Sequence, residues 1–270
     1  MAEGEKDEAA LLQLEFQWIL DEEVHAVFSQ LKTILNECAK RFPLNISLDN
    51  QQKQEKYSLT SPTDNIKCNV LLSGDTIVFG EISFKIQRHQ HVIYRTTITH
   101  ENPWKLQQIQ DAGNHLQQAL RHINNIDDGY NFTSSEEVLH ILGKILGALQ
   151  RGRTSLIVPR KRTIDDLMKS RNMKMLVPNL PEDLAISFYI QSHKIVFAVY
   201  QIQPNTEHGQ TTFNTLQAEA SVPWTNEVLV LFTVALQLAQ QLKDKISVFS
   251  QYKDFHIALP NKPSIVLESL

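Results

Sequence analysis

The chain has 270 residues, enough for one large domain or two of modest size, and its 42% hydrophobic and 21% charged residues are ordinary for a soluble protein. Its formal net charge of −4 gives no general attraction to nucleic acid or to anionic lipid. Only nine residues are glycine, which counts against folds that depend on many tight turns or phosphate-cradling loops.

The first predicted helix runs from about residue 8 to residue 41. Its apolar residues recur at steps of three or four, no glycine or proline interrupts them, and Pro43 stops the pattern. The stripe consists of Leu12, Phe16, Leu20, Val24, Val27, Leu31, Ile34 and Cys38. Leu11, Leu14 and Trp18 make it wider than a coiled-coil seam, which indicates contact with more than one neighbour.

Between residues 45 and 99 the hydrophobic period becomes that of strands. A polar stretch at 49–56 predicts an exposed loop. After it, alternating and β-branched runs predict a small antiparallel meander with one face in solvent. The runs are 69–72, 76–79, 82–86 and 92–96.

A second and a third helix are predicted in the middle of the chain. Asn102 and Pro103 should open the second, because Asn accepts from unpaired N–H groups and proline in the first turn loses no bond. Ser134 and Glu137 predict a capping box for the third. The apolar positions are Ile109, Ala112, Leu116, Ala119, Ile123 and Ile126, then Val138, Leu142, Ile145 and Leu149.

Strand patterns return at 184–189, 194–202 and 213–222, after a basic stretch and a short helix that starts near Thr163. The last predicted helix covers about 224–252. Its heptad positions are Val228, Leu231, Ala235, Leu238, Leu242, Lys245 and Phe249. A second apolar row is formed by Leu229, Phe232, Leu236, Ala239 and Ile246, so that nearly half of the helix surface is apolar.

None of these helices can bury its apolar stripe alone. The sequence therefore predicts an α+β protein in which an antiparallel four-helix bundle, made of the N-terminal, two middle and C-terminal helices, lies beside a small antiparallel β domain. The bundle should take residues 1–42, 100–152 and 223–270, and the β domain residues 43–99 and 153–222. An open alternative is that the last helix pairs with a second copy as a homodimeric zipper. The residues expected in the bundle core are Leu12, Phe16, Leu20, Val24, Val27, Leu31, Ile109, Leu116, Ile123, Leu142, Ile145, Leu231, Leu238, Leu242 and Phe249.

Motifs that carry chemistry are weak in this sequence. Residues 147–154 have the glycine spacing of a phosphate-binding loop, but Arg153 replaces its lysine and the segment ends a helix. His89 and His91 share a strand face without a nearby carboxylate or cysteine at ligand spacing. No G-x-S-x-G or H-E-x-x-H motif occurs. We therefore expect no catalytic residue, no cofactor-binding residue and no metal ligand.

The cysteines and the N-terminus indicate a reducing compartment. Cys38 and Cys68 are too few for a disulfide framework, and the position of Cys38 on a helical stripe favours a buried free thiol. The N-terminal residues are acidic and hold no apolar signal core, so secretion is not expected. No apolar run is long enough to span a membrane.

A basic cluster stands out from this acidic background. It consists of Arg151, Arg153, Arg160, Lys161 and Arg162. The plainer interpretation is a solvated junction between bundle and β domain. The functional interpretation is a surface for an anionic partner or a nuclear-import patch. Because no aromatic residues are interleaved with the basic ones, we expect no nucleic acid partner.

The last helix resembles a known family. Residues 236–250 (LQLAQQLKDKISVFS) resemble the C-terminal signature of the Rogdi family of leucine-zipper-containing proteins, and the blocks at 22–27 and 104–112 agree with it. Pro223 and Trp224 before the last helix also fit. Because these blocks lie in the first, second and last predicted helices, the resemblance covers essentially the whole chain.

The resemblance implies an elongated, two-domain, non-enzymatic adaptor without a cofactor. Such proteins belong to a rabconnectin-type assembly, the counterpart of the fungal RAVE complex, which promotes assembly of the vacuolar proton pump (V-ATPase). The implied partners are a large β-propeller-rich scaffold and the cytosolic sector of the pump, with membrane association only through these partners and a monomer outside the complex. The implied location is the cytoplasm of neurons and other cells, with association to synaptic vesicles or endomembranes and a nuclear or nuclear-envelope pool.

Two other functions remain open from the residues. One is a nuclear zipper-type regulator that acts as a dimer. It would need a basic region before the last helix, whereas residues 217–223 are not basic. The other is an unrecognised hydrolase, which would require a deep polar pocket.

Overall fold

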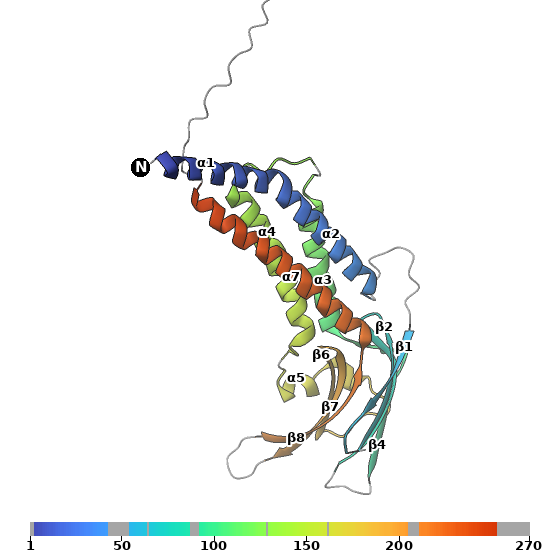
Figure 1. Ribbon diagram of the computed structural model, residues 1–270. Coiled ribbons are helices and arrows are strands. Elements are labelled where there is room, and N and C mark those ends of the chain that lie inside the picture. Colours follow the sequence, from blue (N-terminus) through green and yellow to red (C-terminus); the bar gives the residue numbers. More distant parts are fainter. Residues whose placement is uncertain are drawn as a thin grey trace, which may run out of the picture.

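The protein is elongated, with helices at one end and a curled antiparallel sheet at the other (Figure 1). The computed structural model describes residues 3–42, 54–63, 65–86, 92–127, 129–160, 162–204 and 211–252. No helix within these ranges combines the length and apolarity that a bilayer crossing requires.

The sheet joins the two groups of strands that the sequence separates. In the described part of the chain it has eight strands, with β4-β3-β2-β1-β8-β7-β6 as the main order and β5 paired to β3 beside it. Strand β1 makes the connection, because it pairs with β2 along its length and with β8 where Thr60 lies opposite Glu219. The strands are β1 (Gln54–Thr60), β2 (Ile66–Ser73), β3 (Thr76–Lys85), β4 (Ile93–Ile98), β5 (Trp104–Lys105), β6 (Leu184–Gln191), β7 (Lys194–Pro204) and β8 (Thr211–Ser221).

The long helices come from the start, middle and end of the chain and lie side by side. Helix α7 contacts α2 and α4, and α3 contacts α2 and α4. The helices are α1 (Glu3–Trp18), the π-helical turn η1 (Ile19–Glu23), α2 (Val24–Arg41), α3 (Gln107–Asn124), α4 (Ser135–Ile157), α5 (Ile164–Met168), α6 (Arg171–Lys174), α7 (Pro223–Phe249) and the 3-10 turn η3 (Ser250–Tyr252).

The predicted four-helix bundle beside a small β domain is wrong. The β part is one large sheet that curls into a half-barrel, and a single hydrophobic cluster runs through the sheet and the helices together. The main cause of the error is β1, which lies partly in a stretch predicted to be loop. Only Tyr57 and Leu59 mark its buried face, among polar neighbours. The assignment of residues to two discontinuous domains stays a prediction.

Two predicted helix starts also need correction. The second helix begins at Gln107 and not at Asn102, because Trp104 is buried in β5, where it pairs with Ile77 and packs edge-on against Phe188. Strand pairing and burial of a large aromatic ring prevail there over a local capping signal. The capping box predicted for α4 shows one of its two hydrogen bonds, in which the Ser134 side chain accepts from the backbone N–H of Glu137.

Other predicted elements are confirmed. The meander appears as β2, β3 and β4, and the later runs appear as β6, β7 and β8, each antiparallel to its neighbour. The short helix near Thr163 is α5, which a complete capping box between Thr163 and Asp166 begins. Most of the loop predicted at 49–56 lies outside the described residues.

The expected core residues differ in burial. Ten of them are buried, namely Leu20, Val24, Val27, Leu31, Ile109, Leu116, Ile123, Leu142, Ile145 and Leu242. Leu12, Phe16, Leu231, Leu238 and Phe249 are only partly buried. On α7 the buried line passes through Val228, Phe232, Ala235, Ala239, Leu242 and Ile246. The helix therefore buries positions from both of its apolar rows, because it packs between α2 and α4 and not against one partner.

Helices α4 and α7 approach each other closely at Gly152. A Cβ atom there would lie 2.9 Å from Cζ of Phe232 and 3.3 Å from Cβ of His115, so a glycine is needed. The whole segment 147–154 is helical. Its glycine spacing therefore serves helix packing, and its backbone N–H groups are not arranged around a phosphate.

We expect Leu31→Ala to lower the free energy of unfolding by about 2–5 kcal/mol, because Leu31 is fully buried and its removal leaves a cavity. Leu238→Ala makes the same chemical change at a partly buried site and should cost less. Urea unfolding followed by circular dichroism measures both losses. Equal losses would contradict the difference in packing.

Candidate functional site

A buried side-chain amide joins the helices to the sheet. Gln108, on α3, donates from Nε2 to the carbonyl oxygen of Ile190 at 2.8 Å and to that of Ser155 at 2.9 Å. Its Oε1 accepts from the backbone N–H of Ile190 at 2.8 Å. Because β6 is an outermost strand of the sheet, the amide takes the place that a further strand would occupy.

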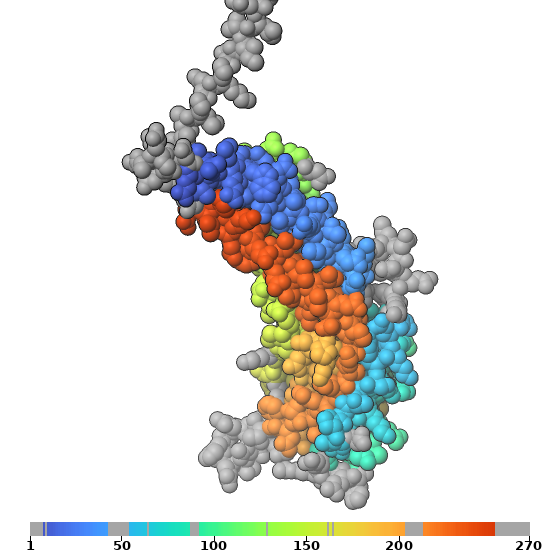
Figure 2. Space-filling view, viewed as in Figure 1, coloured from blue at the N-terminus to red at the C-terminus, as the bar shows by residue number. Residues whose placement is uncertain are grey.

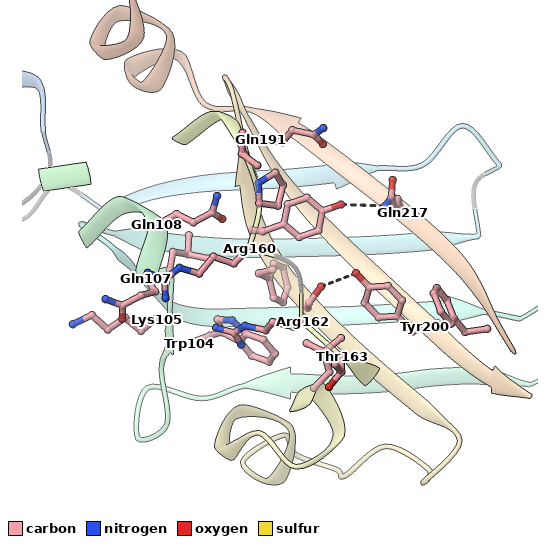
Figure 3. A pocket seen from close by; sticks show the side chains of 18 residues that line it. Trp104, Lys105, Gln107, Gln108, Arg160, Arg162, Thr163, Gln191, Tyr200 and Gln217 are labelled. Carbon is pink, nitrogen blue, oxygen red and sulfur yellow. Dashed lines mark hydrogen bonds between the residues drawn. The ribbon is translucent and has the colours of Figure 1, made fainter. Parts of the chain in front are cut away.

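A cleft of about 780 Å³ opens beside this junction (Figure 3). One side is formed by β5 and the start of α3, a second by the segment from Val158 to α5, and the floor by β6, β7 and β8. The described lining residues include three cations, Lys105, Arg160 and Arg162, and no Asp or Glu. In a chain of net charge −4, this is a locally electropositive site.

The floor of the cleft is aromatic and polar. The Nε2 group of Gln217 donates to Oη of Tyr189 at 3.1 Å, and Ser187 Oγ lies 3.3 Å from Tyr200 Oη. Strand register places Ala198 between Ser187 and Gln217, and its small side chain leaves space above the sheet at this point. Figure 3 shows the two hydroxyl contacts on the sheet side, opposite the helix side with Lys105.

Tyr189 on the floor stays uncharged at neutral pH. Burial raises the pKa of the Tyr189 phenol, and the neighbouring Tyr200 and Glu219 raise it further. The Tyr189 phenol therefore remains a protonated hydroxyl group that can donate or accept hydrogen bonds. Positive charge in the cleft comes only from its rim, as far as the described lining residues go.

The three cations of the rim differ in their partners. Arg160 Nη2 lies 2.7 Å from Oδ2 of Asp111, and Lys105 Nζ lies 3.6 Å from Oδ2 of Asp75. Arg162 makes no ion pair or hydrogen bond to any described side chain, although its charge helps to lower the pKa of the Asp166 carboxyl, which hydrogen bonds from Thr163 chiefly lower. Arg162 is thus the cation best placed to receive an incoming anion.

The structure brings only part of the predicted basic cluster together. Arg160 and Arg162 reach the cleft, whereas Arg151 and Arg153 lie on α4. Arg151 donates to Gln118 at 3.5 Å, and Arg153 donates to the hydroxyl of Thr233 on α7 at 3.3 Å. Lys161 lies outside the described residues.

The aromatic half of the site was missed at the sequence level. Tyr189 and Tyr200 belong to strands whose neighbours are apolar on both faces, so no alternation distinguishes the cleft face from the core face. Their meeting with Gln217 depends on strand register. The preceding basic stretch was a signal for the rim, but no local pattern points to the floor.

The described residues hold no metal-binding cluster and no reactive thiol. No group of three or more His, Cys, Asp or Glu side chains among them is arranged to hold a metal ion. Cys38 and Cys68 are free and buried, which confirms the prediction for Cys38. Burial raises the pKa of Cys38 to about 12 and raises that of Cys68 as well, so neither is a thiolate at neutral pH. His89 and His91 lie outside the described residues.

The family model and the known proteins that this chain resembles all carry the same family name. The family model described as "Rogdi leucine zipper containing protein" matches residues 15–261. Protein rogdi of Drosophila melanogaster is 55% identical over 257 residues, which are 95% of this chain and 95% of that protein. The Danio rerio homolog is 38% identical over 94% of this chain and 99% of its own length, and the Homo sapiens homolog is 37% identical over 91% and 94%.

Replacing Gln108 by Ala should destabilise the protein by about 1–3 kcal/mol for each buried backbone group left unpaired. The groups at risk are the N–H and C=O of Ile190 and the C=O of Ser155. Gln110→Ala is the control, because its amide contacts only the nearby Gln107 among the described hydrogen bonds. Urea unfolding and hydrogen exchange at the Ile190 amide measure the effect. Equal behaviour of the two variants would show that the junction does not depend on Gln108.

Proposed function

The chain belongs to the family of Rogdi leucine zipper containing proteins, and on this premise we propose that it is a non-enzymatic adaptor. The proposed assembly is of the rabconnectin/RAVE type, and its proposed task is to promote assembly of the V-ATPase. Roles in neurons and at synaptic vesicles belong to the same proposal.

The observation that supports a binding role is the composition of the cleft. Its described lining combines three cations with tyrosine hydroxyls and glutamine amides, and it holds no carboxylate, histidine or cysteine. Nucleophilic or acid–base catalysis needs a nucleophile next to a base, or paired titratable groups of separated pKa. A rim of arginine above an aromatic floor is instead typical of surfaces that bind an acidic segment of another protein.

The proposed partners are a large β-propeller-rich scaffold and the cytosolic sector of the pump. The acidic segment would come from one of them, with its carboxylates on Arg162 and Arg160 and an apolar neighbour on the aromatic floor. The proposed location is the cytoplasm, with association to synaptic vesicles or endomembranes through these partners and a nuclear or nuclear-envelope pool.

A zipper-type dimer is the less favoured alternative. Its seam would be α7, yet Val228, Phe232, Ala239 and Ile246 of this helix are fully buried inside the same chain. Helix α7 contacts both α2 and α4. Pairing with a second α7 would require these contacts to open, which would expose a large part of the hydrophobic cluster.

The test is affinity purification of the full chain from cytosol, followed by mass spectrometry. We expect to recover a large scaffold together with subunits of the pump. Recovery of neither would overturn the proposed assembly. A stable homodimer in sedimentation that dissociates when Leu238 is altered would favour the zipper alternative.

Charge reversal at the cleft gives a sharper prediction. Arg162→Glu should weaken binding of an acidic partner by about tenfold, since it replaces an attraction by a repulsion worth about 1–2 kcal/mol. Arg151→Glu is the matched control, because it makes the same charge change on α4 outside the cleft. The measurement is the amount of partner recovered as salt is raised. Equal losses for both variants would show that overall charge, and not the cleft, governs binding.

A further inference from the structure

The N-terminal helix carries an apolar surface that the rest of the described chain leaves uncovered. Leu11, Leu14 and Trp18 of α1 are 67%, 63% and 56% exposed, and the first two are the most exposed large apolar side chains among the described residues. Steps of three and four residues place all three on one face of the helix. We call Leu11, Leu14 and Trp18 the outer stripe.

The outer stripe is held on an anchored helix. On the inner side Phe16 stacks on Phe249 with ring centroids 6.5 Å apart, and Ile19 and Leu20 are buried. Just beyond, Lys245 Nζ lies 2.8 Å from a carboxylate oxygen of Glu23. Figures 1 and 2 show α1 along the end of α7, at the end of the molecule away from the sheet.

The π-helical turn η1 separates the outer stripe from the core of α2. It lies at Ile19–Glu23, directly after Trp18. A π turn holds an extra residue and rotates the following helix relative to the preceding one. The apolar residues of α2 therefore pack inward, while the outer stripe, which widened the predicted stripe on the sequence, points away from these contacts.

The charge around the outer stripe limits what can cover it. Glu8, Glu15, Asp21 and Glu22 are exposed, and no Lys or Arg occurs from residue 8 to residue 23. Glu15 lies four residues after Leu11 and three before Trp18, so it borders the outer stripe directly. An anionic membrane would be repelled, and so would the same face of a second copy.

We infer that the outer stripe docks an amphipathic helix of a partner protein, with an apolar row flanked by Lys and Arg. Apolar side chains three and four residues apart are the usual contact residues when two helices pack through their apolar faces. Tryptophan, which the outer stripe presents at its C-terminal end, is among the side chains that most often dominate such contacts. Docking at the outer stripe does not depend on pump assembly, because any partner that presents such a helix fits it.

The probe is a synthetic helical peptide with a leucine row and lysine flanks, and its control is the same peptide with glutamate flanks. We expect the lysine peptide to bind the full chain at least about tenfold more tightly, and to shift Trp18 fluorescence to the blue. Leu14→Gln with Trp18→Gln should abolish peptide binding. Val230→Gln, which changes an equally exposed residue near the start of α7, should leave it unchanged.

A second variant separates docking from folding. Glu15→Lys with Glu22→Lys takes the summed charge of Glu8, Glu15, Asp21 and Glu22 from −4 to 0 at exposed sites and should remove the preference for the lysine peptide. Equal binding of both peptides to the unaltered chain, full binding after Leu14→Gln with Trp18→Gln, or a lysine preference that survives Glu15→Lys with Glu22→Lys would overturn the inference.

Other occupants give different results, each of which would also overturn it. Self-association lost in Leu14→Gln with Trp18→Gln would assign the outer stripe to a second copy. Binding to phosphatidylserine vesicles lost in the same variant would assign it to a membrane. A red shift of Trp18 emission on removal of residues 253–270 would assign it to the chain's own C-terminal segment. Failure to recover pump subunits would leave these peptide results unaffected, so the two proposals fail separately.

Discussion

The outer edge of β6 is the constraint on which the arrangement of helices and sheet depends. An outermost strand presents backbone N–H and C=O groups that need partners. Gln108 satisfies both groups of Ile190, and Met173 of α6 accepts from the N–H of Ile186 at 3.4 Å. Because the same amide also donates to Ser155 on α4, it fixes the start of α3 and the end of α4 against the sheet at once. The segment that leaves α4 must then pass over β6, and this passage carries Arg160 and Arg162 over the strands and forms the cleft.

Elements with a strong local period were predictable from the sequence, and those that depend on distant partners were not. The long helices carry a helical period, and the strands β2, β3, β4, β6, β7 and β8 carry runs that alternate or are continuously apolar and β-branched. Strand β1 has two buried apolar residues, Tyr57 and Leu59, and becomes a strand because β2 and β8 lie on its two sides. Likewise, Trp104 enters β5 because β3 and Phe188 bury it, against the capping signal two residues earlier. The size of the sheet follows from these two connections, and for that reason the predicted small β domain was wrong.

The candidate site divides in the same way. Two of its three rim cations, Arg160 and Arg162, come from one basic stretch and could be identified from composition, whereas Lys105 lies on β5. Arg151 and Arg153 were grouped with the two arginines but lie on α4. Its floor comes from three strands, and a shift of one residue in register would turn Tyr189 or Tyr200 into the core. Gln108 gave no signal at all, because a glutamine in a helix is ordinary and only its burial beside a strand edge makes it structural. Similarly, the two apolar rows of α7 could be predicted from the sequence, but which positions of each row are buried depends on the positions of α2 and α4.

The cleft lies beside the junction of helices and sheet, the outer stripe lies at the far end of the helices, and the two have opposite charge. The cleft has a basic rim at the sheet end, and the outer stripe has an acidic border at the far end of the helices. The two proposed binding surfaces are held at a fixed separation, because the hydrophobic cluster is continuous from Ile19 to the sheet. Opposite charges also fix the orientation, since a segment suited to one end is repelled at the other. For a proposed adaptor this arrangement has a simple consequence, namely that partner order along the molecule is set by electrostatics while the distance between partners is set by packing.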